Sequence, residues 1–382
     1  MAQKIEEEAT IDGDILETVL SRVPLTDLVA ASRVSRDWNT AVYSSLRHVN
    51  RIKPWLLVHV QTRRHPYATT SYAYDPRSAV WIHLHQLPNL KYISALRSSH
   101  SNFLYMLSPS HFTFTSDPLR LTWTKADAPP RVWRTEPIVA LVNDRVVVAG
   151  GACDFEDDPL AVEIYDLRTR TWDTCESMPS TLNNSAASTW ISIAVRGGDM
   201  YVCEKSSGLT YSFDPVTKSW RGPYDLRPDQ KVFSSAIGLV DGNLIVVGLL
   251  GSSESVEGVK LWKVRSDESM ECEEMGEMPM EMVEKFVGES YCVSSVTVAA
   301  MGKIVFLHNP TDPGVVIQCE ILDGECRWGC VRNTVLNDGS RMQLVVIGCC
   351  DVDISDLMRM AIKSDVELGP SETAYVASHV VD

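Results

Sequence analysis

The sequence lacks the features of a membrane or secreted protein. No apolar run approaches the roughly 20 residues that a helix needs to span a bilayer. The longest candidates, at 294–300 and 344–347, have the length of a strand. The first ten residues include three consecutive glutamates and no apolar stretch, so they do not resemble a secretory signal. We therefore predict a disordered segment at 1–10, a cytoplasmic or nuclear location and no membrane partner.

Groups able to hold a metal or to carry catalysis are also scarce. Ten cysteines in 382 residues are too few for a disulfide scaffold. Cys326 and Cys330, like His83 and His85, lack further ligands at zinc spacing. The sequence contains no phosphate-binding glycine loop, no Gly-x-Ser-x-Gly elbow and no His-Glu-x-x-His helix. We predict no catalytic residue, no metal and no cofactor.

Positive charge is in deficit. The chain has 35 basic against 50 acidic residues, a formal charge of −15 at pH 7. A polyanion is a poor partner for such a surface, so we expect no nucleic-acid binding. Hydrophobic residues make up 45% of the chain, which is near the globular average and excludes disorder as the main state. The length allows about two or three domains.

A helical pattern without glycine occupies residues 14–42. Apolar side chains recur at helix spacing at Ile15, Leu16, Val19, Leu20 and Val23. Pro24 ends this helix, because proline cannot continue the hydrogen-bond ladder. Thr26 and Ser35 are expected to cap a second and a third short helix. Three short helices bury little surface alone, so the module needs a partner.

This stretch resembles the F-box. The matching submotifs are Asp14-Ile15-Leu16, Val19-Leu20-Ser21-Arg22-Val23-Pro24, Asp27-Leu28 and Val34-Ser35-Arg36-Asp37-Trp38, with Asp12 where the family usually has Pro and Ser35 where it often has Cys. The resemblance implies an F-box at 11–50 that binds the Skp-type adaptor of a cullin ubiquitin ligase. Eight residues would divide between its core and its adaptor face: Ile15, Leu16, Leu20, Pro24, Leu25, Leu28, Val34 and Trp38. The alternative is a generic three-helix cap on the main domain.

The remainder of the chain is a degenerate repeat. An Asp followed six residues later by Trp recurs at Asp75 and Trp81, Asp117 and Trp123, Asp166 and Trp172, and Asp214 and Trp220. In a fifth copy Cys272 replaces the Trp, and a sixth, ending at Trp328, is one residue shorter. Between the copies, a polar or glycine turn precedes an apolar run, as at 146–148, where Gly150 and Gly151 follow. Such turns indicate hairpins.

Each unit therefore has four strands and about 50 residues, which is the kelch period. The pattern resembles a kelch β-propeller, and its combination with the F-box resembles the plant F-box/kelch-repeat family. We predict a mainly β protein with six blades over 54–350. The last apolar run, at 343–347, has no partner strands after it, so it should complete the first blade and close the ring. Residues 351–382 are expected to form an acidic tail with a short helix near 354–362.

The repeated Asp and Trp residues are interpreted as structural: Asp opens a turn and Trp packs between blades. The longer, variable connections share one face of a propeller and are the predicted target site; they lie at 152–160, 178–190, 250–258, 274–290 and 309–315. The segment 267–289 is acidic and rich in methionine. We interpret it as a solvated insertion, with an adaptable docking surface as the alternative.

The resemblance implies a substrate-recognition subunit of a cullin–RING ubiquitin ligase, with no covalent step of its own. One alternative is a kelch scaffold with a degenerate F-box, and a second is a propeller oxidase, which its few histidines disfavour. Several members of the family act on phenylpropanoid or flavonoid enzymes, and others act on light-signalling proteins. The resemblance therefore suggests a biosynthetic enzyme, such as chalcone synthase, as the target. Because the chain is acidic, a Lys- and Arg-rich target patch is the expected complement.

Overall fold

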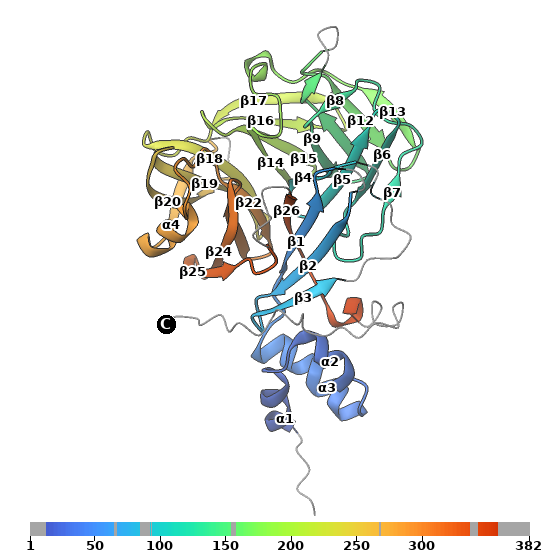
Figure 1. Ribbon diagram of the computed structural model, residues 1–382, viewed down its shortest axis with the longest axis vertical. Helices are drawn as coiled ribbons and strands as arrows, with labels where there is room; N and C mark the ends of the chain where they lie inside the picture. The colour runs from blue at the N-terminus through green and yellow to red at the C-terminus, as the bar shows by residue number, and fades with distance from the viewer. Residues whose placement is uncertain are drawn as a thin grey trace, which may run out of the picture.

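Strands form a ring above a small helical module in the computed structural model, which describes residues 13–64, 67–84, 92, 94–153, 158–266, 269–336 and 343–357 (Figure 1). The predicted disordered segment at 1–10 and most of the predicted tail lie outside these residues. The helical module comprises α1 (Gly13–Leu20), α2 (Leu25–Ala31), α3 (Arg36–Ser44) and a π-helical turn, η1 (Ser45–Val49). It leads directly into the first strand of the ring.

Six four-stranded antiparallel sheets make up the ring. From the inner to the outer strand, blade 1 contains β26 (Gln343–Cys350), β1 (Trp55–Thr62), β2 (Thr69–Asp75) and β3 (Val80–Leu84). Blade 2 contains β4 (Leu96–His100), β5 (Phe103–Ser108), β6 (His111–Thr115) and β7 (Thr124–Lys125). Blade 3 contains β9 (Ile138–Val142), β10 (Arg145–Ala149), β12 (Val162–Asp166) and β13 (Thr171–Thr174).

The remaining three blades follow in chain order. Blade 4 contains β14 (Ile191–Arg196), β15 (Asp199–Glu204), β16 (Leu209–Asp214) and β17 (Ser219–Asp225). Blade 5 contains β18 (Val232–Val240), β19 (Asn243–Ser252), β20 (Ser255–Val264) and β21 (Cys272–Glu277). Blade 6 contains β22 (Thr297–Met301), β23 (Ile304–Asn309), β24 (Asp312–Leu322) and β25 (Glu325–Arg332). A short ribbon of β8 (Arg134–Thr135) and β11 (Ala152–Cys153), a 3-10 turn η2 (Ser180–Leu182) and helix α4 (Met280–Val287) lie in the connections.

The ring closes through the C-terminal strand. Each inner strand contacts the next in the order β26, β4, β9, β14, β18 and β22, and β22 contacts β26 in turn. Strand β26 pairs antiparallel with β1, with Cys350 opposite Trp55 and Gln343 opposite Thr62. Pairing a late strand with the first one removes the exposed edges of an open sheet. The prediction of six blades closed by the last apolar run is confirmed.

The sequence repeat has a local cause in the hairpin between the third and fourth strands. In blade 3 the Asp166 carboxylate accepts hydrogen bonds from the backbone N–H groups of Arg168 and Thr169, at 2.8 and 3.1 Å. Arg170, four residues after the Asp, has a positive φ of 60°. The same bend occurs after Asp75, Asp117 and Asp214, with positive φ at Ala79, Leu121 and Lys218. The aspartate thus satisfies backbone donors of a turn that would otherwise need water.

The repeated tryptophan packs against both its own blade and the preceding one. Trp172 lies directly opposite Tyr165, with ring centroids 5.2 Å apart. Its indole N–H donates to the carbonyl of Ala128, in the link that leaves blade 2. Trp81 and Trp220 stand opposite Tyr74 and Phe213 in the same way. These aromatic pairs fix the register of the outer hairpin.

Two copies depart from this arrangement. Trp123 precedes the short β7 and packs edge-on against Tyr92 instead of a partner on β6. Trp328 lies opposite Cys319, because a two-residue turn at 323–324 tightens the hairpin and shifts its register. The missing residue noted in the sixth copy therefore changes the position of this Trp within the blade.

Gly150 and Gly151 mark a close approach between blade 3 and the link to blade 4. Gly150 has φ of 65°, and a side chain there would place Cβ 2.3 Å from the carbonyl oxygen of Ala186. The Gly151 N–H donates to the same oxygen at 2.9 Å. Glycine is required at position 150, because any Cβ there would overlap the backbone of the link to blade 4.

The acidic, Met-rich segment after 267 is a structural element. Its described residues form β21 and α4, and Val283 and Phe286 on one side of α4 are 2% and 1% exposed. They pack into the core shared by blades 5 and 6 together with Met278. The expectation of a solvated insertion is therefore wrong for these residues, because apolar side chains three apart on a helix give it a buried face.

The helical module shares one hydrophobic core with blade 1. This core contains Leu16, Leu20, Leu25, Leu28 and Val42 of the module, Trp55, Leu57, Ile82 and Leu84 of blade 1, and Val352, Ile354 and Leu357 after β26. The described start of the predicted tail thus packs into the core between the module and blade 1, with a helical turn at 354–357. An ion pair of Asp356 with Arg120 fixes this turn to blade 2. The module is consequently held rigidly on the propeller.

Arg77 is the main polar contact between the module and the propeller. It stands two residues after Asp75, in the outer hairpin of blade 1, and donates to the carbonyls of Leu20, Ser21 and Val23. Its Nε also donates to the carbonyl of Asn50. A cation at these carbonyls satisfies acceptors that α1 leaves free at its C-terminal end and complements its dipole.

We expect Arg77→Ala to destabilise the joint between module and propeller. Loss of hydrogen bonds from a charged donor to half-buried carbonyls costs roughly 1.5–3 kcal/mol. Arg168 is the matched control, because it occupies the same position in blade 3 but is 80% exposed. The urea concentration at the unfolding midpoint should be lower for Arg77→Ala than for the intact chain. For Arg168→Ala it should be unchanged. Equal midpoints in the two variants would contradict this role of Arg77.

Candidate functional site

The structure separates the eight residues predicted for the adaptor face into core and surface. Leu16, Leu20, Leu25 and Leu28 are buried, at most 3% exposed. Pro24 and Trp38 are half-buried. Ile15 and Val34 are 67% and 63% exposed and therefore stand free on the module surface. Of the set, these two are available for a partner without any rearrangement of the core.

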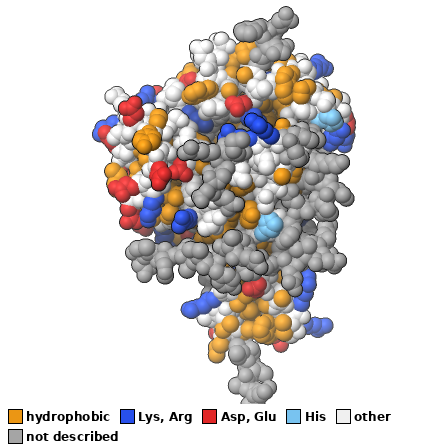
Figure 2. Space-filling view, viewed as in Figure 1, with side chains coloured by type: hydrophobic (Ala, Val, Ile, Leu, Met, Phe, Trp, Pro, Cys, Tyr) orange, Lys and Arg blue, Asp and Glu red, His pale blue; other side chains and the backbone are white. Residues whose placement is uncertain are grey.

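Two further exposed apolar residues were not predicted as part of this face. Val19 is 51% and Tyr43 37% exposed. Ile15 and Val19 lie one helical turn apart on α1, so they share a face; this spacing could have been read from the sequence. Figure 2 shows hydrophobic side chains gathered on the module. Large apolar side chains on such a small module mark an interaction surface.

The second and third helices begin differently from each other. Ser35 caps α3, because its hydroxyl accepts a hydrogen bond from the backbone N–H of Trp38 at 3.2 Å. Thr26, expected to cap α2, lies inside that helix, which begins at Leu25. The Pro24 carbonyl accepts the first backbone bonds, from Asp27 and Leu28. A proline just before the first turn is preorganised for this entry, so no side-chain cap is needed.

The module covers one face of the propeller. Arg77 lies in a turn between third and fourth strands, and such turns share a face with those between first and second strands. The opposite face carries the second-to-third turns and the links between blades, and we call it the loop face. Two of its predicted long loops are shorter than expected, because β19 and β20 extend to Ser252 and Ser255, and β23 and β24 to Asn309 and Asp312.

A cavity of about 680 Å³ opens where the inner strands meet on the loop face. Residues of β4, β14, β22 and β26 line it, together with Arg63, Glu136, Lys205 and His308. Serine and threonine hydroxyls form much of the remaining wall, among them Ser98, Ser99, Ser188, Thr189, Ser294 and Thr311. We call this cavity the channel mouth. Polar and apolar side chains both contribute to its lining, and its volume is typical of a ligand site.

The charged groups of the channel mouth are connected by hydrogen bonds. The Arg97 guanidinium lies 3.3 Å from the Glu136 carboxylate, which also accepts from the Thr189 hydroxyl. The Lys205 ammonium donates to the Thr189 carbonyl at 2.9 Å. Burial lowers the pKa of Lys205 to about 8 and the pKa of His308 to about 4. At neutral pH Lys205 is therefore mainly charged and His308 neutral.

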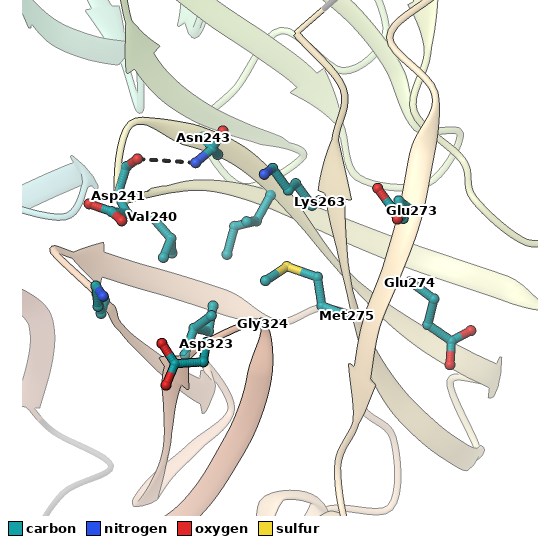
Figure 3. A pocket seen from close by; sticks show the side chains of 12 residues that line it. Val240, Asp241, Asn243, Lys263, Glu273, Glu274, Met275, Asp323 and Gly324 are labelled. Atoms are coloured by element: carbon teal, nitrogen blue, oxygen red, sulfur yellow. Dashed lines mark hydrogen bonds between the residues drawn. The ribbon is translucent and has the colours of Figure 1, made fainter.

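A second cavity, of about 410 Å³, lies between blades 5 and 6 on the face that carries the module. Lys263 and Met275 project into it from blade 5, opposite Asp323 and Gly324 of blade 6 (Figure 3). Its floor is apolar, since Val240 and Ile245 are 4% and 1% exposed. The Asn243 amide donates to the Asp241 carbonyl at its edge and so is already used.

The described residues contain no cluster of three or more His, Cys, Asp or Glu side chains that could hold a metal. Within the same part of the chain, no helix is long and apolar enough to cross a membrane. The candidate sites are an exposed apolar face on the helical module and two cavities, one at the centre of the six-bladed propeller and one between blades 5 and 6.

The chain is similar to known proteins in its sequence. The family profile described as F-box domain matches residues 13–50. A curated relative, F-box/kelch-repeat protein At1g23390 of Arabidopsis thaliana, is 42% identical over 375 residues, covering 94% of each chain. A solved structure titled "Structure of YjhT" covers 68% of this chain and 90% of its own, with a TM-score of 0.41 and 12% identity.

The protein combines an interaction module with a binding propeller and belongs to the F-box/kelch-repeat family. Members of this family are non-catalytic adaptors of ubiquitin ligases, and an F-box implies binding of a Skp-type adaptor. The recognition of an F-box and of kelch repeats from sequence is confirmed. No finding bears on the suggested phenylpropanoid target.

Proposed function

We propose that this chain is the substrate-recognition subunit of an SCF-type cullin–RING ubiquitin ligase. The observation that carries the proposal is the arrangement of its two surfaces. The F-box leaves Ile15, Val19 and Val34 exposed, while its buried leucines pack in a core shared with blade 1. The loop face points away from the F-box and is open to a target. One rigid body can then hold an adaptor and a target at the same time.

Its contribution to ubiquitin transfer is proximity. Holding a target lysine beside the charged conjugating enzyme converts a bimolecular encounter into an effectively unimolecular step. The shared core and Arg77 fix the F-box relative to the propeller, so the distance between the two partners is set by the fold. No residue of this chain is assigned a covalent role.

The target remains a matter for experiment. A phenylpropanoid or flavonoid enzyme such as chalcone synthase is our proposed first candidate, on the family resemblance alone. The competing hypothesis is a scaffold with a degenerate F-box, and its support is the two departures from the family pattern, Asp12 and Ser35. Ser35 supports the F-box fold, because it caps α3. Asp12 lies outside the described residues.

The test is a pull-down from plant extract under proteasome inhibition, comparing the intact chain with Ile15→Asp. Leu20→Ala is unsuitable, since truncating a buried leucine costs about 2–5 kcal/mol and would unfold the module. We expect adaptor and cullin to copurify with the intact chain only. One further protein should copurify with both, and it should carry more ubiquitin chains when it is captured by the intact chain. Absence of adaptor and cullin from both samples would leave only the scaffold hypothesis.

A further inference from the structure

The channel mouth carries positive charge in a protein whose net charge is −15. Among the residues that the structure describes, three cationic side chains line it, Arg63, Arg97 and Lys205, against a single carboxylate, that of Glu136. That carboxylate is already shared between Arg97 and the Thr189 hydroxyl. The local charge therefore has the opposite sign to the global one, and it is the local charge that a bound group meets.

Lys205 is the most deeply placed of these cations. Its ammonium has a carbonyl partner, from Thr189, but no ion pair is found for it among the described residues. A buried ammonium without a carboxylate is unfavourable, which is why its pKa is lowered from 10.5 to about 8. An anion entering the channel mouth would relieve this cost. The binding of a negatively charged group beside Lys205 would therefore stabilise its charged form.

Polar atoms without a partner surround the same cavity. His308 is 6% exposed and its Nδ1 forms no hydrogen bond among the described residues. The side-chain oxygen of Gln343, on β26, is similarly unused. Buried polar atoms are normally paired, so unused atoms on one cavity wall indicate that something polar occupies the space. Neighbouring hydroxyls, such as those of Ser294 and Ser295, can donate hydrogen bonds to a carboxylate.

An exposed aromatic residue lies in the chain between two residues that line the channel mouth, Thr189 and Ile191. Trp190 is 56% exposed, directly before β14, and its carbonyl accepts the backbone N–H of Lys205 at 2.9 Å. Exposed tryptophans next to charged groups are frequent anchors of protein interfaces. A peptide segment bound in the cationic cavity is long enough to reach Trp190 as well, whereas an isolated small ion contacts the cavity alone.

We propose that the channel mouth binds an acidic segment of the target protein, whose carboxylates contact Lys205 and Arg97 while adjacent side chains pack on Trp190. The inference deepens the proposed function and rests on it. It reverses the expectation of a Lys- and Arg-rich target patch, which was based on net charge. A charge-complementary segment also gains from faster, salt-sensitive association.

Fluorescence anisotropy with the full chain tests this assignment. The probes are a labelled ten-residue peptide with three glutamates and one Leu, its twin with glutamines, and a lysine version; unlabelled glutarate and inorganic phosphate compete as free small anions. We expect the glutamate peptide to bind at least tenfold tighter than either twin at 50 mM salt and to weaken at 300 mM. Glutarate and phosphate should compete only at much higher concentration.

Variants locate the binding. Lys205→Gln and, separately, Arg97→Gln should each weaken the glutamate peptide severalfold to tenfold, and Trp190→Ala should weaken it without changing the salt dependence. Lys231→Gln is the matched control, because Lys231 is exposed outside the cavity lining. Equal binding of the twin peptides, no binding at 1 mM, or an effect of Lys231→Gln as large as that of Lys205→Gln would overturn the proposal. Adaptor binding, measured on the same preparations, is independent of these outcomes and reports on the proposed function alone.

Discussion

Replacing Val34 by Asp should reduce capture of a Skp-type adaptor by at least about a hundredfold. Val34 is 63% exposed in the free chain, and we propose that it contacts the adaptor. Burying a valine side chain at an interface contributes about 1.5–3 kcal/mol, and an unpaired carboxylate at the same place adds a desolvation penalty of similar or larger size. Ile15→Asp, at 67% exposure on α1, should have a comparable effect. Titration of the purified chain with purified adaptor measures both.

The propeller supplies a closely matched control. Val216 is 62% exposed, in the outer hairpin of blade 4, and Val216→Asp makes the same chemical change at the same exposure. It should leave adaptor affinity and the urea midpoint unchanged. Because neither Val34 nor Val216 belongs to a core, Val34→Asp and Val216→Asp should have the same free energy of unfolding as the intact chain. Adaptor binding that survives Val34→Asp and Ile15→Asp together would show that these residues do not form the adaptor face.

The division of the F-box into core and surface could not be obtained from its sequence. The motif names positions such as Leu20 and Val34 without saying which of them faces a partner. The F-box core of this protein is completed by residues distant in the chain, among them Trp55, Ile82 and Leu357. Their contribution depends on how blade 1 sits against α1, which is a tertiary contact and leaves no periodic signal.

The propeller was more predictable, because its architecture repeats. The copies in blades 1, 3 and 4 each specify their own hairpin through local hydrogen bonds and a directly opposed aromatic pair. An error arose where an acidic composition concealed the buried face of α4. The shortened sixth copy also gave no indication that Trp328 stands opposite Cys319. The charge of the channel mouth was missed for a related reason: Arg63, Arg97 and Lys205 come from three different blades and meet only in the closed ring.

A buried ion pair in blade 3 leads to the largest stability effect we expect. Arg134 and Glu163 are each 1% exposed, and Arg134 Nη2 lies 2.6 Å from the carboxylate. The carboxylate also accepts from the backbone N–H groups of Arg131 and Val132, and the guanidinium donates to the carbonyls of Gly150 and Ala161. Two charges thus satisfy four backbone groups between the ribbon of β8 and β11 and the third strand of the blade.

Glu163→Ala should lower the free energy of unfolding by about 3–5 kcal/mol, because it leaves a buried guanidinium without a countercharge and two N–H groups without an acceptor. Glu163→Gln should cost less, since an amide oxygen can still accept from one of the backbone donors. The exposed pair of Arg170 and Asp127 is the contrast: both side chains are more than half exposed, and Asp127→Ala should leave the urea midpoint nearly unchanged. If Glu163→Ala and Asp127→Ala proved equally mild, the Arg134 side chain would have to reach solvent in the variant, and the buried pair would not hold blade 3 together. Since that blade contributes β9 to the ring beside the channel mouth, a loss of glutamate-peptide binding in Glu163→Ala at a urea concentration that leaves adaptor binding intact would localise the damage to the propeller.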